Sequence, residues 1–297
     1  AGYVTREAAE HTGLLEGTPV AGGAFDIDAC AIAVNVTDEN NICMIAGTWS
    51  INEYLCKKPV TDGSVMMNSF SFLPEYYLVE ECSPTSAGNI EWFISALLPE
   101  LKSMAERNEL SIYDQLNLWV SQMPPETLCP TFLPFLMASN VHPNAMGCFL
   151  GMSNFHTRVH LARSIYEGVA FSHRYHLEKL LLSKTTPTKS IRLAGGAAKS
   201  AVWTQMFADV MNLPVEAVDV NETGALGCAV ICAVACGAYD SLGSAADAMC
   251  RMSPPRKPIP KNVAIYEQKY ALYKKAIEAL NPYWDELRTT REALEIQ

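Results

Sequence analysis

The chain of 297 residues has few charged side chains and no run of basic ones. Charged residues make up 18% of the sequence, and 22 basic against 32 acidic residues give a formal net charge of −10. Without a basic patch, neither nucleic acid nor an anionic membrane surface is an expected partner. An anionic ligand would have to be held locally, by backbone amides and helix termini rather than by an overall positive field.

The sequence also lacks CxxC pairs and a stretch long enough to cross a membrane. Its 10 cysteines are scattered, and a chain of this length with 49% apolar residues can build a core without a disulfide framework. We therefore expect reduced thiols, a cytoplasmic location and no signal peptide. The most apolar stretch, 223–239, is shorter than a membrane span and is broken by three glycines, which predicts a buried helix.

The pattern of apolar residues predicts β-hairpins in the first part of the chain and alternating strands and helices in the second. Strands are predicted at 42–46, 51–55, 65–72, 76–80, 190–194 and 215–220. Helices are predicted at 5–13, 86–107, 111–123, 157–182, 200–211, 223–237 and 264–287. Strands that alternate with helices indicate an α/β sheet.

Asp26 is the strongest single candidate for a catalytic side chain. It follows Gly22-Gly23-Ala24-Phe25 at a predicted strand-to-helix junction, where a ligand can approach the carboxylate closely. A general base that acts on a hydroxyl group needs that exposure. The alternative is an ordinary helix N-cap, with Asp28 as a second acid in the first turn.

Two turns are candidates for phosphate binding. Gly47-Thr48-Trp49 separates two predicted strands, so its amides and the threonine hydroxyl are available to an anion. Gly88-Asn89 opens an apolar helix, which suits an anion, although a cap from Ser83 or Ser86 on a surface helix explains the same pattern.

A third glycine turn, Gly195-Gly196, follows one predicted strand and precedes a helix. Such a turn lets a nucleotide base or phosphate pass close to the backbone. The sequence contains neither GxGxxG nor GxxxxGKS/T, so neither a Rossmann site nor a P-loop is predicted.

The cysteines and histidines do not predict a metal site. Cys228, Cys232 and Cys236 share one helix face, but the helix carries no histidine or acid, so we predict small-residue packing there. Four histidines lie far apart in pairs along a long predicted helix, and we expect them to be surface or helix-packing residues: His156, His160, His173 and His176.

Two segments separated by seven residues resemble the second signature of the FGGY family of carbohydrate kinases. They are GCFLGM at 147–152 and HLARSIYE at 160–167. Further segments resemble other motifs of the family, in the family's order: 22–26, 47–48, 195–200 with Trp203, and 222–229. The resemblance covers essentially the whole chain. Three details are similar to the branch of L-xylulose and 3-keto-L-gulonate kinases: Phe25 before Asp26, Trp49 after Gly47-Thr48, and the run 83–93.

The resemblance implies a ribonuclease-H-like (actin-like ATPase, sugar kinase) α/β fold, with a mixed sheet flanked by helices. It also implies transfer of the ATP γ-phosphoryl group, with Mg²⁺, to a hydroxyl of a sugar such as L-xylulose or a related keto-sugar acid. The implied roles are these: Asp26 as general base, Phe25 and Asp26 at the sugar, Gly47, Thr48 and Gly88 at the phosphates, and Gly195, Gly196 and Ser200 at the adenine and ribose. Glu91 occupies a place near the nucleotide where some members carry a polar residue.

The resemblance further implies a division into residues 1–36, the end of an N-terminal kinase domain, and 37–297, the C-terminal domain. The family's early Asp-x-Gly-Thr phosphate loop does not occur in the sequence, which begins at Ala1. We therefore expect a missing N-terminal domain as partner, an apolar contact surface within 1–36, and no useful sugar phosphorylation by the chain alone. A homodimer stays open.

Two other classes of function are compatible with parts of the sequence. One is an actin-like domain that binds a nucleotide for regulation or scaffolding without phosphorylating; such a domain would not need Asp26 in its cleft. The other is a cysteine-nucleophile hydrolase, which needs a cysteine beside a histidine. Cys148 near His142 is a poor candidate for that pair.

Overall fold

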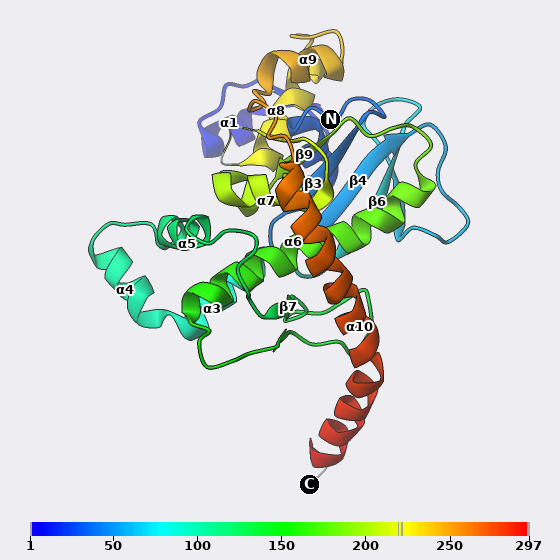
Figure 1. Cartoon of the computed structure of the whole chain (residues 1–297). Coiled ribbons are helices and arrows are strands. Elements are labelled where there is room, and N and C mark those ends of the chain that lie inside the picture. The colour runs from blue at the N-terminus through cyan, green and yellow to red at the C-terminus, as the bar shows by residue number, and fades with distance from the viewer. Residues whose placement is uncertain (1, 219, 221, 296–297) are drawn as a thin grey trace.

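The fold is a six-stranded mixed sheet with helices on both faces (Figure 1). The computed structural model describes residues 2–218, 220 and 222–295, with side chains as far as residue 294. Within these residues, no helix combines the length and the apolar character needed to cross a membrane.

The strands are β1 (Gly2–Tyr3), β2 (Pro19–Val20), β3 (Asn41–Ala46), β4 (Ser50–Cys56), β5 (Met67–Phe70), β6 (Tyr77–Ser83), β7 (Thr131–Leu133), β8 (Cys148–Leu150), β9 (Ser190–Ala194) and β10 (Val215–Ala217). The helices are α1 (Arg6–Thr12), α2 (Asp26–Ala33), α3 (Gly88–Leu97), α4 (Pro99–Arg107), α5 (Ile112–Ser121), α6 (Arg158–Ser183), α7 (Ala201–Met211), α8 (Thr223–Ala235), α9 (Leu242–Met249) and α10 (Pro260–Glu295). A 3₁₀ turn, η1, spans Gly196–Lys199.

The main sheet has the strand order β10-β9-β3-β4-β6-β5. β9 lies parallel to both β10 and β3, whereas β4, β6 and β5 continue the sheet in antiparallel fashion. Ile45 pairs with Ala194, and Ser50 pairs with Ser83. These registers place the segments that follow β3, β6 and β9 at one edge of the sheet.

The two faces of the sheet have separate cores. Ile42, Met44 and Tyr54 point to the face covered by α3, α6 and α7, where the largest apolar cluster lies. Leu55 and Leu78 point to the other face, where they pack against residues of α2 and of the segment that follows it. Because side chains alternate along β4, this strand contributes to the core on both faces of the sheet, each covered by its own layer of helices.

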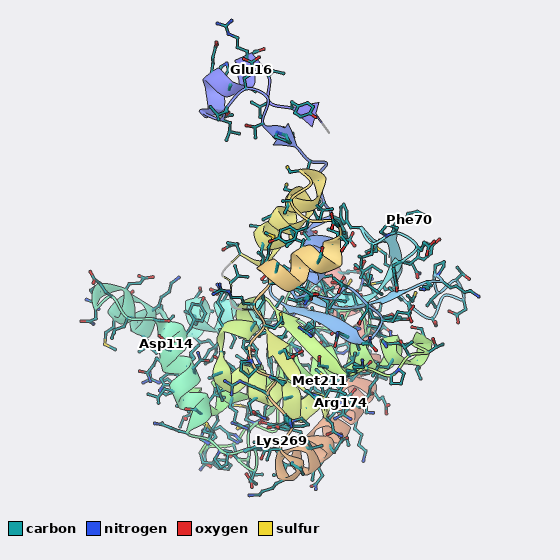
Figure 2. The ribbon with its side chains drawn as sticks, turned by 90° about the horizontal axis from the view of Figure 1, so that it is seen from above. Glu16, Phe70, Asp114, Arg174, Met211 and Lys269 are labelled. Atoms are coloured by element: carbon teal, nitrogen blue, oxygen red, sulfur yellow. The ribbon has the colours of Figure 1, made fainter. Side chains whose placement is uncertain are left out.

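The first 20 residues form a small unit of β1, α1 and β2. Thr5 caps α1 by accepting a hydrogen bond from the amide of Ala8, and Gly13 ends the helix in the left-handed conformation. α1 contains no buried residue, and Figure 2 shows Glu16 on a segment that stands apart from the rest of the chain.

Most predicted elements are present, with shifted ends. The predicted strands at 42–46, 51–55, 76–80 and 190–194 and the predicted helices at 157–182 and 200–211 lie within a residue or a few of the observed ones. The stripe of tyrosines on the last helix is a packing face as predicted, because Tyr266, Tyr270 and Tyr273 are buried. The predicted strand 215–220 is shorter, and residue 219 lies outside the described part.

Two helix predictions were wrong in extent. The single helix predicted at 86–107 is divided into α3 and α4 at Leu98, because Pro99 disfavours helical backbone at the residue before it. The last helix runs from Pro260 to Glu295 rather than over 264–287, and Pro282 lies inside it.

The prediction of a buried helix after residue 223 was also wrong. α8 buries only Gly227 and Val230, and Cys228, Cys232 and Cys236 are exposed rather than packed. The spacing i, i+4, i+8 places these cysteines on one side of α8, and Cys228 lies near Cys30 of α2. A helix that is apolar all round does not reveal from its sequence which face is covered.

Gly227 holds α8 against α2 at very short range. A Cβ atom at this position would lie 1.8 Å from the carbonyl oxygen of Ala29, whereas at Gly224 the nearest atom would be the Cys30 sulfur at 3.8 Å. The two helices can therefore approach this closely only with glycine at 227.

We expect Gly227→Ala to destabilise the fold by about 2 kcal/mol or more, because one of the two helices must move to make room for the methyl group. Gly224→Ala is the matched control on the same helix and should be neutral or slightly stabilising. Urea unfolding curves of both variants test this. Equal midpoints for Gly227→Ala and the parent chain would show that the α2–α8 contact is loose.

Candidate active site

The turn between β3 and β4 lies against the start of α3. The amide of Ser86 donates a hydrogen bond of 3.0 Å to the carbonyl oxygen of Thr48. A Cβ atom on Gly88 would lie 3.7 Å from the same oxygen, in ordinary contact. Thr48 itself is exposed, and its hydroxyl has no hydrogen-bond partner among the described residues. The turn thus presents a free hydroxyl beside a helix N-terminus.

The turn at Gly195-Gly196 packs against the turn at Gly47-Thr48. Gly195 has a φ of +84°, and a Cβ atom there would lie 2.6 Å from the carbonyl oxygen of Ala46 and 2.9 Å from the nitrogen of Gly47. Only glycine fits both the backbone conformation and the space. Gly196, the next residue, is exposed, and a Cβ atom there would meet no atom within 4 Å.

Five of the six predicted nucleotide-binding residues are therefore neighbours, although they come from three segments far apart in the sequence: Gly47, Thr48, Gly88, Gly195 and Gly196. The two turns and the first residue of the ten-residue helix α3 meet here. Such an arrangement suits phosphate oxygens, because helix N-termini carry partial positive charge.

A cavity of about 240 Å³ adjoins this cluster. α3, α5, α6, the 3₁₀ turn and α7 contribute to its wall, and Lys199 is the one cationic side chain among the lining residues that the structure describes. The wall consists of Ala87, Ile90, Glu91, Ser111, Tyr113, Asp114, Asn117, Tyr166, Gly196, Lys199, Ser200 and Trp203. The cavity has room for a ribose or a base next to the proposed phosphate end.

Ser200, the sixth predicted residue, holds the wall of the cavity together. It is buried and caps α7, because its side chain accepts a hydrogen bond from the amide of Trp203. Its hydroxyl also donates a bond of 2.6 Å to Oδ1 of Asn117, which accepts a second bond of 3.0 Å from the Tyr166 hydroxyl. The rings of Tyr166 and Trp203 stack with centroids 4.2 Å apart.

Asp26 and Phe25 come from the opposite face of the sheet. Asp26 is the first residue of α2 rather than its N-cap, a position taken by Phe25 without a side-chain bond. The Asp26 side chain is exposed, and Oδ1 accepts a bond of 3.0 Å from the amide of Ile27. The Phe25 side chain is 48% exposed. Both side chains are open to a ligand, and the structure places neither in the wall of the cavity.

A row of acids lies under α2, close to Asp26. Glu53 of β4 pairs with Glu80 of β6, and both are fully buried. Among the described residues no N–H or O–H group donates a hydrogen bond to Glu53, and its hydrogen-bonding neighbour is the thiol of Cys43. Burial, and secondarily the charges of Asp28 and Asp26, raise the pKa of Glu80 to about 7. Burial raises the pKa of Asp28 to about 6, and burial together with the charge of Glu80 raises the pKa of Glu53 well above its usual range.

Several of these residues are not recognisable as site residues in the sequence. Tyr113 and Asn117 stand at i and i+4 on one predicted helix, and this spacing is the only signal that they share a face. Nothing in the sequence pairs Glu53 with Glu80, because the pairing depends on the register of β4 against β6.

The sequence matches a known family over most of the sheet region. The profile of the FGGY family of carbohydrate kinases, C-terminal domain, matches residues 42–236. A protein of Haemophilus influenzae named "Probable L-xylulose kinase" is 35% identical over 285 residues, which is 94% of this chain and 55% of the relative. The L-xylulose/3-keto-L-gulonate kinase of Escherichia coli is 35% identical over 297 residues, covering 95% of this chain and 54% of the relative.

A solved structure has the same fold. The crystal structure of xylulose kinase from Rhodospirillum rubrum superposes with a TM-score of 0.80 at 27% sequence identity, over 96% of this chain and 56% of that one. The predicted ribonuclease-H-like fold and the predicted family branch are thereby confirmed. The chain spans about half the length of the curated relatives it matches.

Gly196 and Gly195 provide a matched pair for testing the nucleotide end of the cluster. We expect Gly196→Val to leave the fold intact, because the site is open, and to weaken the binding of ADP about tenfold or more by blocking close approach to the backbone. Gly195→Val should instead unfold or strongly destabilise the chain. Thermal unfolding and calorimetric titration of ADP measure the two effects. Unchanged ADP affinity in a folded Gly196→Val variant would place the nucleotide elsewhere.

The buried acids predict that stability falls as the pH rises. Folding raises the pKa of Glu80 from 4.5 to about 7 and that of Asp28 from 3.8 to about 6, so the folded state binds more protons than the unfolded state between these values. The free energy of unfolding should therefore decrease as the pH rises from 3.8 to about 7 through these two groups.

Glu80→Gln should flatten this pH dependence, because the amide stays neutral, and should raise the melting temperature more at pH 8 than at pH 5. Melting curves across pH 4.5–8 test this, with the exposed Glu100→Gln as control. A Glu80→Gln variant with the parent's slope would show that Glu80 does not take up a proton on folding.

Proposed function

The chain belongs to the FGGY family of carbohydrate kinases, and we propose that it takes part in ATP-dependent phosphorylation of a sugar hydroxyl. The observation that carries this proposal is the convergence of three glycine-containing segments on one edge of the sheet, next to a cavity of about 240 Å³. A phosphoryl-transfer site needs mainly such positioning and charge stabilisation.

In the proposed reaction, the phosphates of ATP lie at Gly47, Thr48 and Gly88, and the nucleoside lies beside Gly195, Gly196 and Ser200. The free hydroxyl of Thr48 and the amide of Gly88 would donate hydrogen bonds to phosphate oxygens. Lys199 lies on the same wall and adds a positive charge.

Asp26 is the proposed general base. Its exposed carboxylate at the start of α2 would accept the proton of the sugar hydroxyl as that oxygen attacks the γ-phosphorus. Phe25, the residue before Asp26, has a side chain that is 48% exposed, and it would offer apolar contact to the carbon face of the sugar.

Mg²⁺ enters the proposal only as a partner of the ATP phosphates. The described residues contain no group of three histidine, cysteine, aspartate or glutamate side chains arranged to hold a metal ion. Magnesium in kinases is commonly held by phosphate oxygens, water and one or two carboxylates. The chain's own residues thus fit nucleotide phosphates but do not fit a preformed magnesium cage.

The proposed acceptor is a ketopentose such as L-xylulose or a related keto-sugar acid. The support is the similarity to relatives with those names. Three expectations remain predictions: the division into residues 1–36 and 37–297, a possible homodimer and a cytoplasmic location. The ten cysteines are free thiols, as expected from their scattered positions.

We also propose that an N-terminal kinase domain is the partner that completes the cleft. The matched profile is that of a C-terminal domain, and the relatives are nearly twice as long as the matched region. The unit of β1, α1 and β2 exposes Tyr3 and Leu15, by 71% and 80%, and thus offers apolar surface to such a domain.

The alternatives have no comparable support. No relative reported above is a regulatory or scaffolding domain without kinase activity. For a cysteine hydrolase, burial raises the pKa of Cys148 to about 11, which opposes formation of the thiolate nucleophile. His142 lies instead 3.6 Å from a carboxylate oxygen of Asp285.

Asp26→Asn tests the proposed chemistry in the chain complemented with the N-terminal domain of such a kinase. We expect ATP binding to stay nearly intact and kcat to fall by about two to four powers of ten, which is the usual contribution of a general base. A coupled assay of ADP release with L-xylulose measures kcat. Exposed Asp240→Asn is the control and should keep the parent rate.

Parent-like turnover by Asp26→Asn would remove Asp26 from the mechanism. The chain without a complementing domain should release no ADP above background, because one side of the cleft cannot fix the in-line geometry alone. Robust turnover by the chain alone would contradict the need for a partner domain.

A further inference from the structure

Four of the ten cysteines gather around the contact between α2 and α8. Cys30 lies on α2 and is partly buried, whereas three cysteines on one side of α8 are exposed: Cys228, Cys232 and Cys236. The proposed phosphoryl transfer gives none of these thiols a role. Their grouping at a contact between two helices calls for an account of its own.

Cys30 and Cys228 flank the tight contact between the two helices. Cys30 follows Ala29, whose carbonyl oxygen would lie 1.8 Å from a Cβ atom on Gly227, and Cys228 is the residue after that glycine. The Cys30 sulfur would lie 3.8 Å from a Cβ atom on Gly224. Gly224 and Cys228 stand at i and i+4, which places them one turn apart on the same side of α8. The Cys30 sulfur therefore lies beside the row of α8 positions to which Cys228 belongs.

The two thiols differ in reactivity. Burial above all, and then nearby negative charges that include the Cys228 thiolate, raise the pKa of Cys30 to about 12. Cys30 therefore stays a protonated thiol at neutral pH. Cys228 is exposed, so it is the thiol of the pair that a dissolved oxidant meets first.

The other thiols of α8 are poor partners for Cys228. Residues at i and i+4 of a helix have Cβ atoms about 5–6 Å apart, whereas a disulfide needs Cβ atoms about 3.5–4.5 Å apart. Cys228 and Cys232 therefore cannot form a disulfide without unwinding α8, and the same holds for Cys232 and Cys236. A link across the α2–α8 contact is not bound by this helical spacing.

We propose that Cys30 and Cys228 form an oxidative modification site, at which a peroxide joins the two thiols in a disulfide that ties α2 to α8. Hydrogen peroxide oxidises the Cys228 thiol to a sulfenic acid and is itself reduced to water. The Cys30 sulfur then displaces hydroxide from the sulfenic acid, its proton leaves with that hydroxide as a second water, and the S–S bond forms. A dithiol reductant restores both thiols and is oxidised to its own disulfide.

The site goes beyond the proposed function, because it needs neither a nucleotide nor a partner domain. It also bears on the placement of a proposed catalytic residue. Asp26 stands one helical turn before Cys30 on α2, so the disulfide would anchor the helix that carries this carboxylate.

Oxidation of the purified chain with hydrogen peroxide at neutral pH, followed by alkylation of the remaining thiols, tests the proposal. Mass spectrometry should show the loss of two hydrogen atoms and two fewer alkylated thiols than in the reduced chain. Peptide mapping should place the link between Cys30 and Cys228, and dithiothreitol should reverse it. The melting temperature should rise by about 5 °C or more, because the link closes a loop of almost 200 residues.

Variants separate the two steps of the reaction. Cys228→Ser and Cys30→Ser should each abolish the cross-link and the rise in melting temperature. In Cys30→Ser the sulfenic acid on Cys228 has no partner, so dimedone should trap it there. Cys30→Ala adds no polar group to the partly buried position and repeats this test independently of any effect of serine on folding. Cys232→Ser, on the same exposed side of α8, is the matched control and should cross-link as the parent chain does.

Three results would overturn the proposal. The first is a disulfide within one chain that maps to another pair of cysteines. The second is a folded parent chain in which peroxide modifies Cys228 while Cys30 stays a free thiol. The third is a cross-linked dimer as the main product, because the disulfide would then join two chains instead of two helices. None of these results bears on the proposed kinase function, which the nucleotide-binding and Asp26 experiments test separately.

Discussion

The parallel pairing of β3 with β9 is the constraint on which the candidate site depends. Because Ile45 pairs with Ala194, the chain leaves both strands at the same edge and at the same level. Gly195 then packs directly on the backbone of Ala46 and Gly47. The antiparallel register of β4 and β6 extends this edge, since Ser50 opposite Ser83 brings the start of α3 beneath Thr48. Strand register, rather than any side-chain network, assembles the three turns.

The two faces of the sheet carry different candidate site residues. The face under α3, α6 and α7 carries the cavity, whose wall is fixed by the bonds of Asn117 to Ser200 and Tyr166. The face under α2 carries Asp26 at its surface and a buried acid pair beneath it. Under the proposed function, a nucleotide and a sugar would approach the same sheet edge from its two sides, which suits transfer of a group between them.

Local patterns were sufficient to predict most of the fold. Strand and helix periods predicted the main elements, a glycine between two strands predicted the turn at 47, and glycine before a helix predicted the turns at 88 and 195. The sequence could not predict that these turns meet, because that depends on pairings between residues about 150 positions apart. Motif resemblance supplied the missing long-range information. It did not extend to Tyr113, Asn117 or the Glu53–Glu80 pair, whose roles depend on helix placement and register, and it did not indicate which face of α8 is exposed.

The contact between Gly227 and Ala29 links the mobility of two distant parts of the chain. Backbone meets backbone there, with no flexible side chain between the helices to absorb a displacement. α2 and α8 must therefore move together, so the position of Asp26 is coupled to residues almost 200 positions later in the sequence. A displacement of α8 would therefore carry the first turn of α2 with it, so the position of Asp26 depends on the placement of a distant helix as well as on rotation of its own side chain.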